Sequence, residues 1–278
     1  MRRMLWSACA GAIIVALTAP AVAGASVLDV FERLAGRGLS PAPLVPTTAP
    51  PLLGPNDGTL DGSPTRRRSG YALRLAHYTP AGPDAIIAID GGEYRSVRAA
   101  LRDYSGDRRR SIRIRGRRGF LLTQRGGEER HLFWSEGGRV YHLGTGTPKK
   151  VSARQLRATA AGLEPLKGYY IGSSSDPDKS SYARVGTTAR TITLYIEFNA
   201  DCTFTPHAGQ AAVVLVPLRG NSFSLDVAQT RLGSKPWTGS ITGTIAADAV
   251  SLHYDVSGTI DGESCSGSET LTLPRGRH

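Results

Sequence analysis

Residues 70–166 contain apolar positions at two different spacings. A period of two, typical of strands, occurs in several short runs, and a helical spacing of three to four occurs in two others. The pattern therefore predicts a mixed α/β module. Its expected strands cover residues 71–79, 84–90, 110–115, 119–124, 131–135 and 139–143, and its expected helices cover 94–104 and 152–163.

Turn and cap residues separate these runs. Gly116 interrupts two of the expected strands, and Glu136-Gly137-Gly138 is a hairpin signal between two others. Ser152 stands where an N-cap residue is expected for the second helix. The first part of the fold should therefore combine short strands, one hairpin among them, with two short helices.

Residues 167–278 show alternation without a convincing helix. Gly, Asn and Asp interrupt the alternating runs about every 8–12 residues. This spacing predicts a compact antiparallel β-sandwich or barrel, which makes the whole chain an α+β protein. Its expected strands cover residues 191–198, 212–218, 222–227, 240–245, 250–256 and 269–273.

The N-terminal 69 residues are expected to lie outside both folded parts. Residues 1–23 have the form of a signal peptide, with Arg2-Arg3, an apolar stretch and an Ala-Val-Ala site; the alternative is an uncleaved anchor. Residues 24–39 predict a short amphipathic helix that either docks on a later domain or frays. Residues 40–69 hold seven prolines and predict a linker without a packed core.

The cysteines point to an oxidising compartment. Cleavage of the signal removes Cys9 and leaves Cys202 and Cys265, which an exported chain should join in one disulfide. A loop of this length is worth about 3–4 kcal/mol in the chain-entropy model. We expect a secreted or cell-envelope protein that meets the membrane only through its signal or by peripheral contact.

Positive charge is concentrated in the α/β module. The formal net charge is +11, and residues 69–166 hold 18 Lys and Arg against 9 Asp and Glu. Residues 167–278 hold 9 against 10. In residues 111–115 the arginines should share one strand face and the isoleucines the other. Either this is an ordinary soluble surface, or it binds an anionic partner.

The residues we expect to bind are four arginines and one tryptophan. The anionic partner would be an envelope polymer, a lipid headgroup or an acidic protein, and nucleic acid is not expected for an exported chain without interleaved aromatics. The tryptophan follows Lys235-Pro236 in an expected turn, as an exposed contact or as a residue covering the end of the β core. These candidates are Arg113, Arg115, Arg117, Arg118 and Trp237.

Signatures of catalysis are missing from the sequence. It has no Gly-x-Ser-x-Gly, His-Glu-x-x-His, Walker or dinucleotide motif, so we predict no catalytic residue, metal or cofactor. His131 and His142 could approach each other across the expected hairpin. They are interpreted either as a metal or catalytic pair or as half-exposed strand residues.

Residues 132–163 resemble a known pattern. The segment from Leu132 to Leu143, with Trp134-Ser135-Glu136-Gly137 and Tyr141, followed by a small-residue helix, resembles extracytoplasmic domains of bacterial anti-sigma and sigma-regulatory proteins. These are related to the half-barrel lipoprotein-sorting fold, and the resemblance implies sensing or binding. The C-terminal part, with its Gly168-Tyr169-Tyr170 opening and late Ser-Cys-Ser-Gly, is similar to secreted all-β domains of unknown function.

The sequence as a whole predicts a secreted, non-enzymatic binding or scaffolding protein of the cell envelope. Its ligand is not specified by any motif. One alternative is an extracellular hydrolase with dispersed active-site residues. Another is an extracytoplasmic sensor or regulatory protein.

Overall fold

The structure is a computed structural model that describes most of the chain beyond the N-terminus. The predicted signal peptide, residues 1–23, lies outside the described residues, as do parts of the predicted helix and linker. The described ranges are 28–33, 42–47, 58–64, 70–79, 82–104, 108–124, 129–145, 151–203, 207–227, 237–260 and 262–276.

Seven antiparallel strands form the first sheet, in the order β2-β3-β4-β8-β7-β6-β5. A short helix, α2 (Val97–Asp103), connects β4 to β5. The strands are β2 (Gly58–Pro64), β3 (Tyr71–Thr79), β4 (Gly82–Gly91), β5 (Arg108–Ile114), β6 (Arg117–Thr123), β7 (Arg130–Glu136) and β8 (Arg139–Thr145).

Two tight turns set the register of this sheet. Arg115 and Gly116 join β5 to β6 with φ values of 51° and 76°, and Gly137 and Gly138 join β7 to β8 with φ values of 58° and 76°. Positive φ at both turn positions is the geometry of the two-residue hairpin that matches strand twist. The predicted break at Gly116 and the predicted 131–143 hairpin are confirmed.

The two faces of the seven-stranded sheet pack against different elements. One face carries Leu122 and Phe133, which contact Ala100 and Leu101 of α2. The opposite face packs against α3 (Ala153–Ala161) and the helical residues 28–33. Helix α3 begins with a capping box between Ser152 and Gln155, so the predicted cap is confirmed.

The prediction that residues 40–69 lack packed structure is wrong in two places. Strand β1 (Leu44–Pro46) pairs with β9 (Leu163–Pro165), and β2 is the edge strand of the seven-stranded sheet. Leu44 and Val45 are buried, and the hydroxyl of Tyr71 donates to the carbonyl oxygen of Leu44 at 2.6 Å. Prolines are tolerated here because edge strands and strand ends need fewer backbone donors.

Eight antiparallel strands form the second sheet, in the order β10-β11-β12-β17-β16-β15-β14, with β13 also paired to β12. Side chains from both halves of this order belong to one hydrophobic core, as in a sandwich or a barrel. The strands are β10 (Gly168–Ser173), β11 (Tyr182–Thr187), β12 (Thr191–Cys202), β13 (His207–Pro217), β14 (Ser222–Asp226), β15 (Trp237–Ile245), β16 (Ala249–Ile260) and β17 (Glu263–Pro274).

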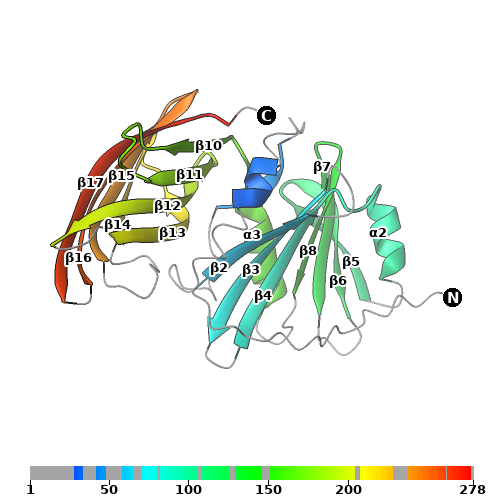
Figure 1. The fold of residues 1–278 in the computed structure, drawn as a ribbon. Helices are drawn as coiled ribbons and strands as arrows, with labels where there is room; N and C mark the ends of the chain where they lie inside the picture. The colour runs from blue at the N-terminus through cyan, green and yellow to red at the C-terminus, as the bar shows by residue number, and fades with distance from the viewer. Residues whose placement is uncertain are drawn as a thin grey trace.

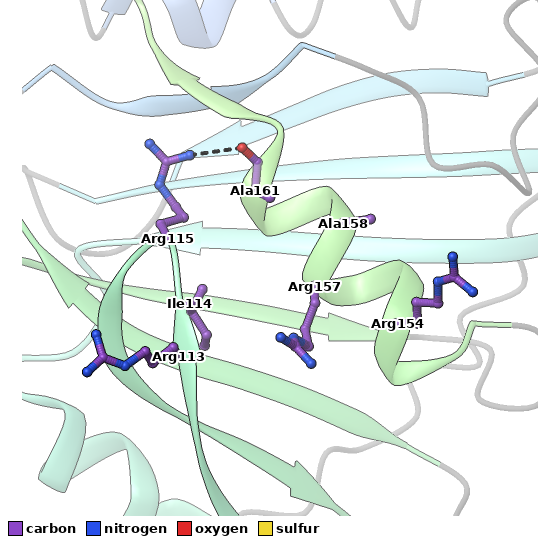
Figure 2. A pocket seen from close by; sticks show the side chains of 7 residues that line it. All are labelled: Arg113, Ile114, Arg115, Arg154, Arg157, Ala158 and Ala161. Atoms are coloured by element: carbon purple, nitrogen blue, oxygen red, sulfur yellow. Dashed lines mark hydrogen bonds between the residues drawn. The ribbon is translucent and has the colours of Figure 1, made fainter.

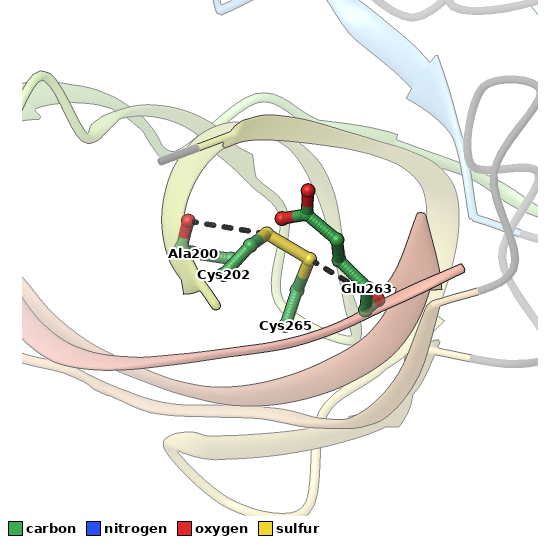
Figure 3. Close-up of a disulfide and its surroundings, with 4 residues drawn as sticks. All are labelled: Ala200, Cys202, Glu263 and Cys265. Carbon is green, nitrogen blue, oxygen red and sulfur yellow. Dashed lines mark hydrogen bonds between the residues drawn. A yellow bond between two sulfur atoms is a disulfide. The ribbon is translucent and has the colours of Figure 1, made fainter. Parts of the chain in front are cut away.

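The predicted disulfide joins two strands of this sheet. Cys202 near the end of β12 and Cys265 near the start of β17 are directly opposite in the strand register and bonded through sulfur (Figure 3). The ladder between β12 and β17 has two residue pairs, Asp201 with Ser266 and Cys202 with Cys265, so the covalent bond reinforces a short strand pairing. The Cys202–Cys265 prediction is confirmed.

The helical residues 28–33 lie between the two sheets (Figure 1). Leu28 and Phe31 are buried, and Phe31 lies so close to Gly186 of β11 that any side chain there would collide with its ring. Arg184 of β11 donates to Glu32 at 3.0 Å and also pairs with Asp29. Of the two outcomes expected for this helix, docking is the observed one.

Candidate functional site

Strand β5 forms one edge of the seven-stranded sheet and carries most of the dense arginine run. Arg108, Arg109, Arg110 and Arg113 are exposed along it. Charged side chains on an edge strand hinder pairing with a second chain. Part of the basic character therefore has a structural explanation that requires no ligand.

A pocket of about 500 Å³ lies where β5 and its turn approach α3 (Figure 2). The small side chains of Ala158 and Ala161 leave this space open. None of the described residues that line it is acidic. The lining residues are Arg113, Ile114, Arg115, Arg154, Arg157, Ala158 and Ala161.

Arg115 supports α3 and has its hydrogen-bonding groups engaged. Its Nε donates to Glu136 at 2.8 Å, and its Nη1 donates to the carbonyl oxygens of Ala160, Ala161 and Leu163. The carbonyl oxygens at the C-terminal end of a helix have no backbone donor within the helix, and a guanidinium group there supplies hydrogen bonds and a favourable positive charge. The prediction that Arg115 shares a solvated strand face with Arg113 is wrong, because Arg115 lies in the turn with left-handed φ.

Three other arginines of the pocket remain available for a ligand. Arg113, Arg154 and Arg157 are exposed, and among the described residues none of them has an ion-pair partner. Figure 2 shows their side chains spread around the pocket rather than converging on one point. This arrangement suits an extended anion better than a small enclosed one.

Arg117 and Arg118 extend the positive surface onto β6. Both are exposed, and Arg118 lies directly opposite Arg113 in the strand register. The guanidinium of Arg118 lies 5.9 Å from the centre of the Phe120 ring. We call Arg113, Arg117, Arg118, Arg154 and Arg157 the basic surface.

Sequence reasoning missed the two arginines contributed by α3. Arg154 and Arg157 are three residues apart, which places them on one face of a helix that Ser152 was expected to cap. That spacing could have indicated a basic helix face at Arg154 and Arg157. The approach of α3 to β5 depends on tertiary packing, which the sequence pattern does not specify.

Trp237 is a core residue, which contradicts its prediction as an exposed binding residue. It is 5% exposed, and its ring meets that of Phe198 edge-on at 5.1 Å between centroids. Gly209 of β13 leaves room for this pair, since a Cβ there would lie within 3.0 Å of the indole. The alternative expected for Trp237, covering the β core, is the one observed.

His131 and His142 do meet across the β7–β8 hairpin. His131 Nδ1 lies 3.0 Å from His142 Nε2, and His142 Nδ1 lies 2.9 Å from Asp90 Oδ2. Both rings are buried rather than half-exposed. Burial, followed by the charge of His142, lowers the pKa of His131 to about 3.

This histidine pair lacks the partners of a nucleophilic site. Among the described residues no serine, threonine or cysteine side chain bonds to either ring. Within the same part of the chain, no group of three or more His, Cys, Asp or Glu side chains could hold a metal ion. The geometry therefore offers a base without a nucleophile to activate.

Comparisons with known proteins found no relative for this chain. No protein-family model, no curated protein and no solved structure matches the chain. Within the described ranges, every helix is too short or too polar to cross a bilayer.

Proposed function

We propose that the chain is a secreted, non-enzymatic protein of the cell envelope that binds an anionic polymer through the basic surface. The observation that carries this proposal is the pocket between β5 and α3, whose described lining holds four arginines and no acidic residue. Three of those arginines have no ion-pair partner among the described residues. Exposed guanidinium groups are suited to phosphate and carboxylate because they donate two parallel hydrogen bonds.

The shape of the basic surface favours a polymer over a small ligand. Its arginines come from α3, from β5 and from the start of β6, where Arg118 is the cross-strand neighbour of Arg113. A repeating anion can contact several such groups at once, and each contact contributes to avidity. A lipid surface and an acidic protein are the other anionic partners that the tests below distinguish.

The alternative functions receive less support from the described residues. A hydrolase needs an activated nucleophile or paired carboxylates in a cleft, and the histidine pair lacks such partners. A lipid-binding half-barrel needs an open apolar groove. The sheet face that would line such a groove is filled by Leu156 and Ala160 of α3 and by Leu28 and Phe31.

The eight strands of the second sheet share one hydrophobic core, which supports the finer prediction that residues 167–278 form a sandwich or barrel.

The proposal is tested by measuring binding of the purified chain to poly(glycerol phosphate), with uncharged dextran as the negative ligand. The triple variant Arg113→Gln, Arg154→Gln, Arg157→Gln should bind at least about tenfold more weakly, a loss of about 1.4 kcal/mol. Wild-type binding should weaken as salt rises from 50 to about 200 mM, because exposed charges are screened.

A matched control separates the site from net charge. The variant Lys167→Gln, Lys179→Gln, Arg219→Gln removes the same three charges from the second sheet and its loops. It should lose less than about threefold in affinity, because distant charges are screened. Equal losses in both triple variants would mean that no site exists. Binding to anionic vesicles or to an acidic protein, but not to the polymer, would reject the polymer as ligand.

A further inference from the structure

The pocket between β5 and α3 combines an aliphatic part with a charged part (Figure 2). Three of its described lining residues have aliphatic side chains, namely Ile114, Ala158 and Ala161. Ile114 is buried and belongs to the hydrophobic core on this side of the sheet. The other described lining residues are arginines, so the base of the pocket at Ile114 is apolar while most of the charge lies in solvent.

The pocket lies between elements that are fixed in place. Leu156 and Ala160 are fully buried and anchor α3 on the sheet. Arg115 joins the β5–β6 turn to the end of this helix, because it donates to the carbonyl oxygen of Leu163 at 2.5 Å and to Glu136 at 2.8 Å. A ligand therefore meets a space that exists before binding, which lowers the entropy lost on association.

A bare anion does not suit the aliphatic part. The guanidinium of Arg115 is engaged in the bonds to α3 and Glu136, and the side chains of Arg113, Arg154 and Arg157 spread around the pocket (Figure 2). A phosphate seated against Ile114 would lose water without gaining a hydrogen bond from that side chain, which is unfavourable. Phosphates should therefore bind at the exposed arginines, and an uncharged group should fill the space between them.

The size and chemistry of the pocket favour a sugar ring as that group. A volume of about 500 Å³ lies in the range of roughly 300–1,000 Å³ that is typical of pockets for small organic ligands. A lipid acyl chain would need a longer apolar lining than three short side chains. The C–H groups of a sugar can pack on aliphatic side chains, while its hydroxyls stay in water or accept hydrogen bonds from arginines.

We propose that the pocket binds a sugar ring attached to the phosphate repeat of the polymer, and that Ala158 and Ala161 determine this specificity by leaving the space open. The inference rests on the proposed binding of an anionic polymer and specifies its class, a sugar-substituted polyphosphodiester. The ring packs on Ile114 and the two alanines, while phosphates of the same polymer contact the three exposed arginines.

The two alanines are suited to this role by their position on α3. They are three residues apart and therefore lie on one face of the helix. Both are exposed, so a larger side chain at either position would enter the pocket rather than the core. Ala158 and Ala161 can thus be changed without removing an arginine or a core residue.

The test compares two polymers of equal length and phosphate content. One is bare poly(glycerol phosphate), and the other carries glucose on the glycerol hydroxyl. In isothermal titration calorimetry, the full chain should bind the glucosylated polymer about tenfold more tightly, because burial of roughly 60 Å² of C–H surface is sufficient for that factor. Equal affinity for the two polymers would overturn the inference.

The variant Ala158→Leu tests whether the pocket causes the preference. Leucine is a good helix former and the position is exposed, so α3 should stay folded. The variant should bind both polymers as the wild type binds the bare one, and this retained binding shows that the arginines are in place. A preference that persists in Ala158→Leu would contradict the role of the pocket.

Two more variants complete the comparison. Ala161→Leu fills the pocket from the next turn of α3 and should also remove the preference; loss of all polymer binding in both pocket variants would count against a specificity role. Ala247→Leu adds the same side chain at an exposed position between β15 and β16 and should keep the preference. Loss of the preference in Ala247→Leu as well would show that the pocket is not its cause.

The triple variant Arg113→Gln, Arg154→Gln, Arg157→Gln separates this inference from the proposed function. It should bind both polymers at least about tenfold more weakly than the wild type. Arginine-dependent binding without a preference for the glucosylated polymer would reject the sugar pocket and leave the proposed function standing. A wild type that binds neither polymer would reject both.

Discussion

The two sheets of this protein are stabilised by different chemistry. The seven-stranded sheet carries the charge excess and buries polar groups in its interior, including His131, His142 and Arg139. The eight-stranded sheet has an apolar core reinforced by a disulfide, and the polar side chains buried with it are Arg184 and hydroxyl residues such as Ser181 and Thr193. The comparison shows that one chain can place its buried histidines and its exposed arginines on one β structure and covalent reinforcement on the other.

Strands β16 and β17, in the middle of the second sheet's strand order, present mainly uncharged polar side chains to solvent. Buried and exposed residues alternate along β16 and β17. The exposed positions are mostly serine and threonine, whose hydroxyls are compatible with both strand geometry and water. We therefore expect perturbations of the second sheet to affect stability, and perturbations of the first to affect stability, pH response and binding.

The largest expected effect is a core truncation in the second sheet. Trp237→Ala removes a buried indole and leaves a cavity beside Phe198, so it should cost about 3–5 kcal/mol of unfolding free energy. Chemical denaturation followed by circular dichroism measures this. The basic surface is remote from the change, so polymer affinity of the folded variant should stay within about twofold. A loss below about 1 kcal/mol would contradict the burial of this ring.

Removal of the disulfide should have the next largest effect. Cys202→Ala with Cys265→Ala should lower the unfolding free energy by about 3–4 kcal/mol, since the bond restricts the unfolded chain. The measurement is denaturant unfolding of wild type and double variant, each with and without reductant. Reductant should destabilise only the wild type; an equal effect on both proteins would show that the bond is not the cause.

Acid should destabilise the first sheet through His131. The pKa of His131 is lowered to about 3 in the folded chain. Its imidazole therefore takes up a proton near pH 6.5 in the unfolded chain but stays neutral at that pH in the folded chain. Stability is therefore fully present above pH 6.5 and falls as the pH drops toward 3, by at most about 1.4 kcal/mol per unit.

The His131→Gln variant checks this assignment. Melting temperatures between pH 7 and 4 should decline less steeply in His131→Gln than in wild type. An exposed histidine of the second sheet, His253, supplies the control variant His253→Gln, which should decline as the wild type does. Parallel curves for wild type and His131→Gln would show that other groups govern acid sensitivity.

The smallest expected effect is a difference in stability between substitutions of two arginines in the β5–β6 hairpin. Arg115→Gln removes the cation bound to Glu136 and to the end of α3, so it should cost about 1–3 kcal/mol. Arg117→Gln, two residues away and exposed, should change stability by less than about 0.5 kcal/mol. Thermal unfolding of both variants tests the difference, and similar costs would contradict the structural assignment of Arg115.

Local sequence signals predicted the elements more successfully than their partners. The 131–143 hairpin, the cap at Ser152 and the Cys202–Cys265 bond follow from short patterns, and the structure confirms them. The strands at Leu44–Pro46 and Gly58–Pro64 were missed because proline-rich composition suggested a linker. Their structure depends on partners far away in sequence, which composition does not reveal.

The candidate site was predicted only in part for a similar reason. The arginine run on β5 and β6 was visible, whereas Arg154 and Arg157 join it through the packing of α3. Arg115 and Trp237 have the residue types expected at a binding surface. The β5–β6 turn directs Arg115 to the end of α3. The missing side chain at Gly209 leaves space for Trp237 in the core.

The sequence by itself determined the antiparallel β character of residues 167–278, the break at Gly116, the hairpin turn at Gly137-Gly138, the disulfide partners and the location of the charge excess. Those features depend on periodicity, turn chemistry and composition, which act over a few residues or on the chain as a whole. Only the tertiary structure decided which of the described arginines lack an ion-pair partner, which aromatic rings are buried and that His131 meets His142 beside Asp90. Such contacts join residues from separate strands and helices, and their distances are set by how those elements pack.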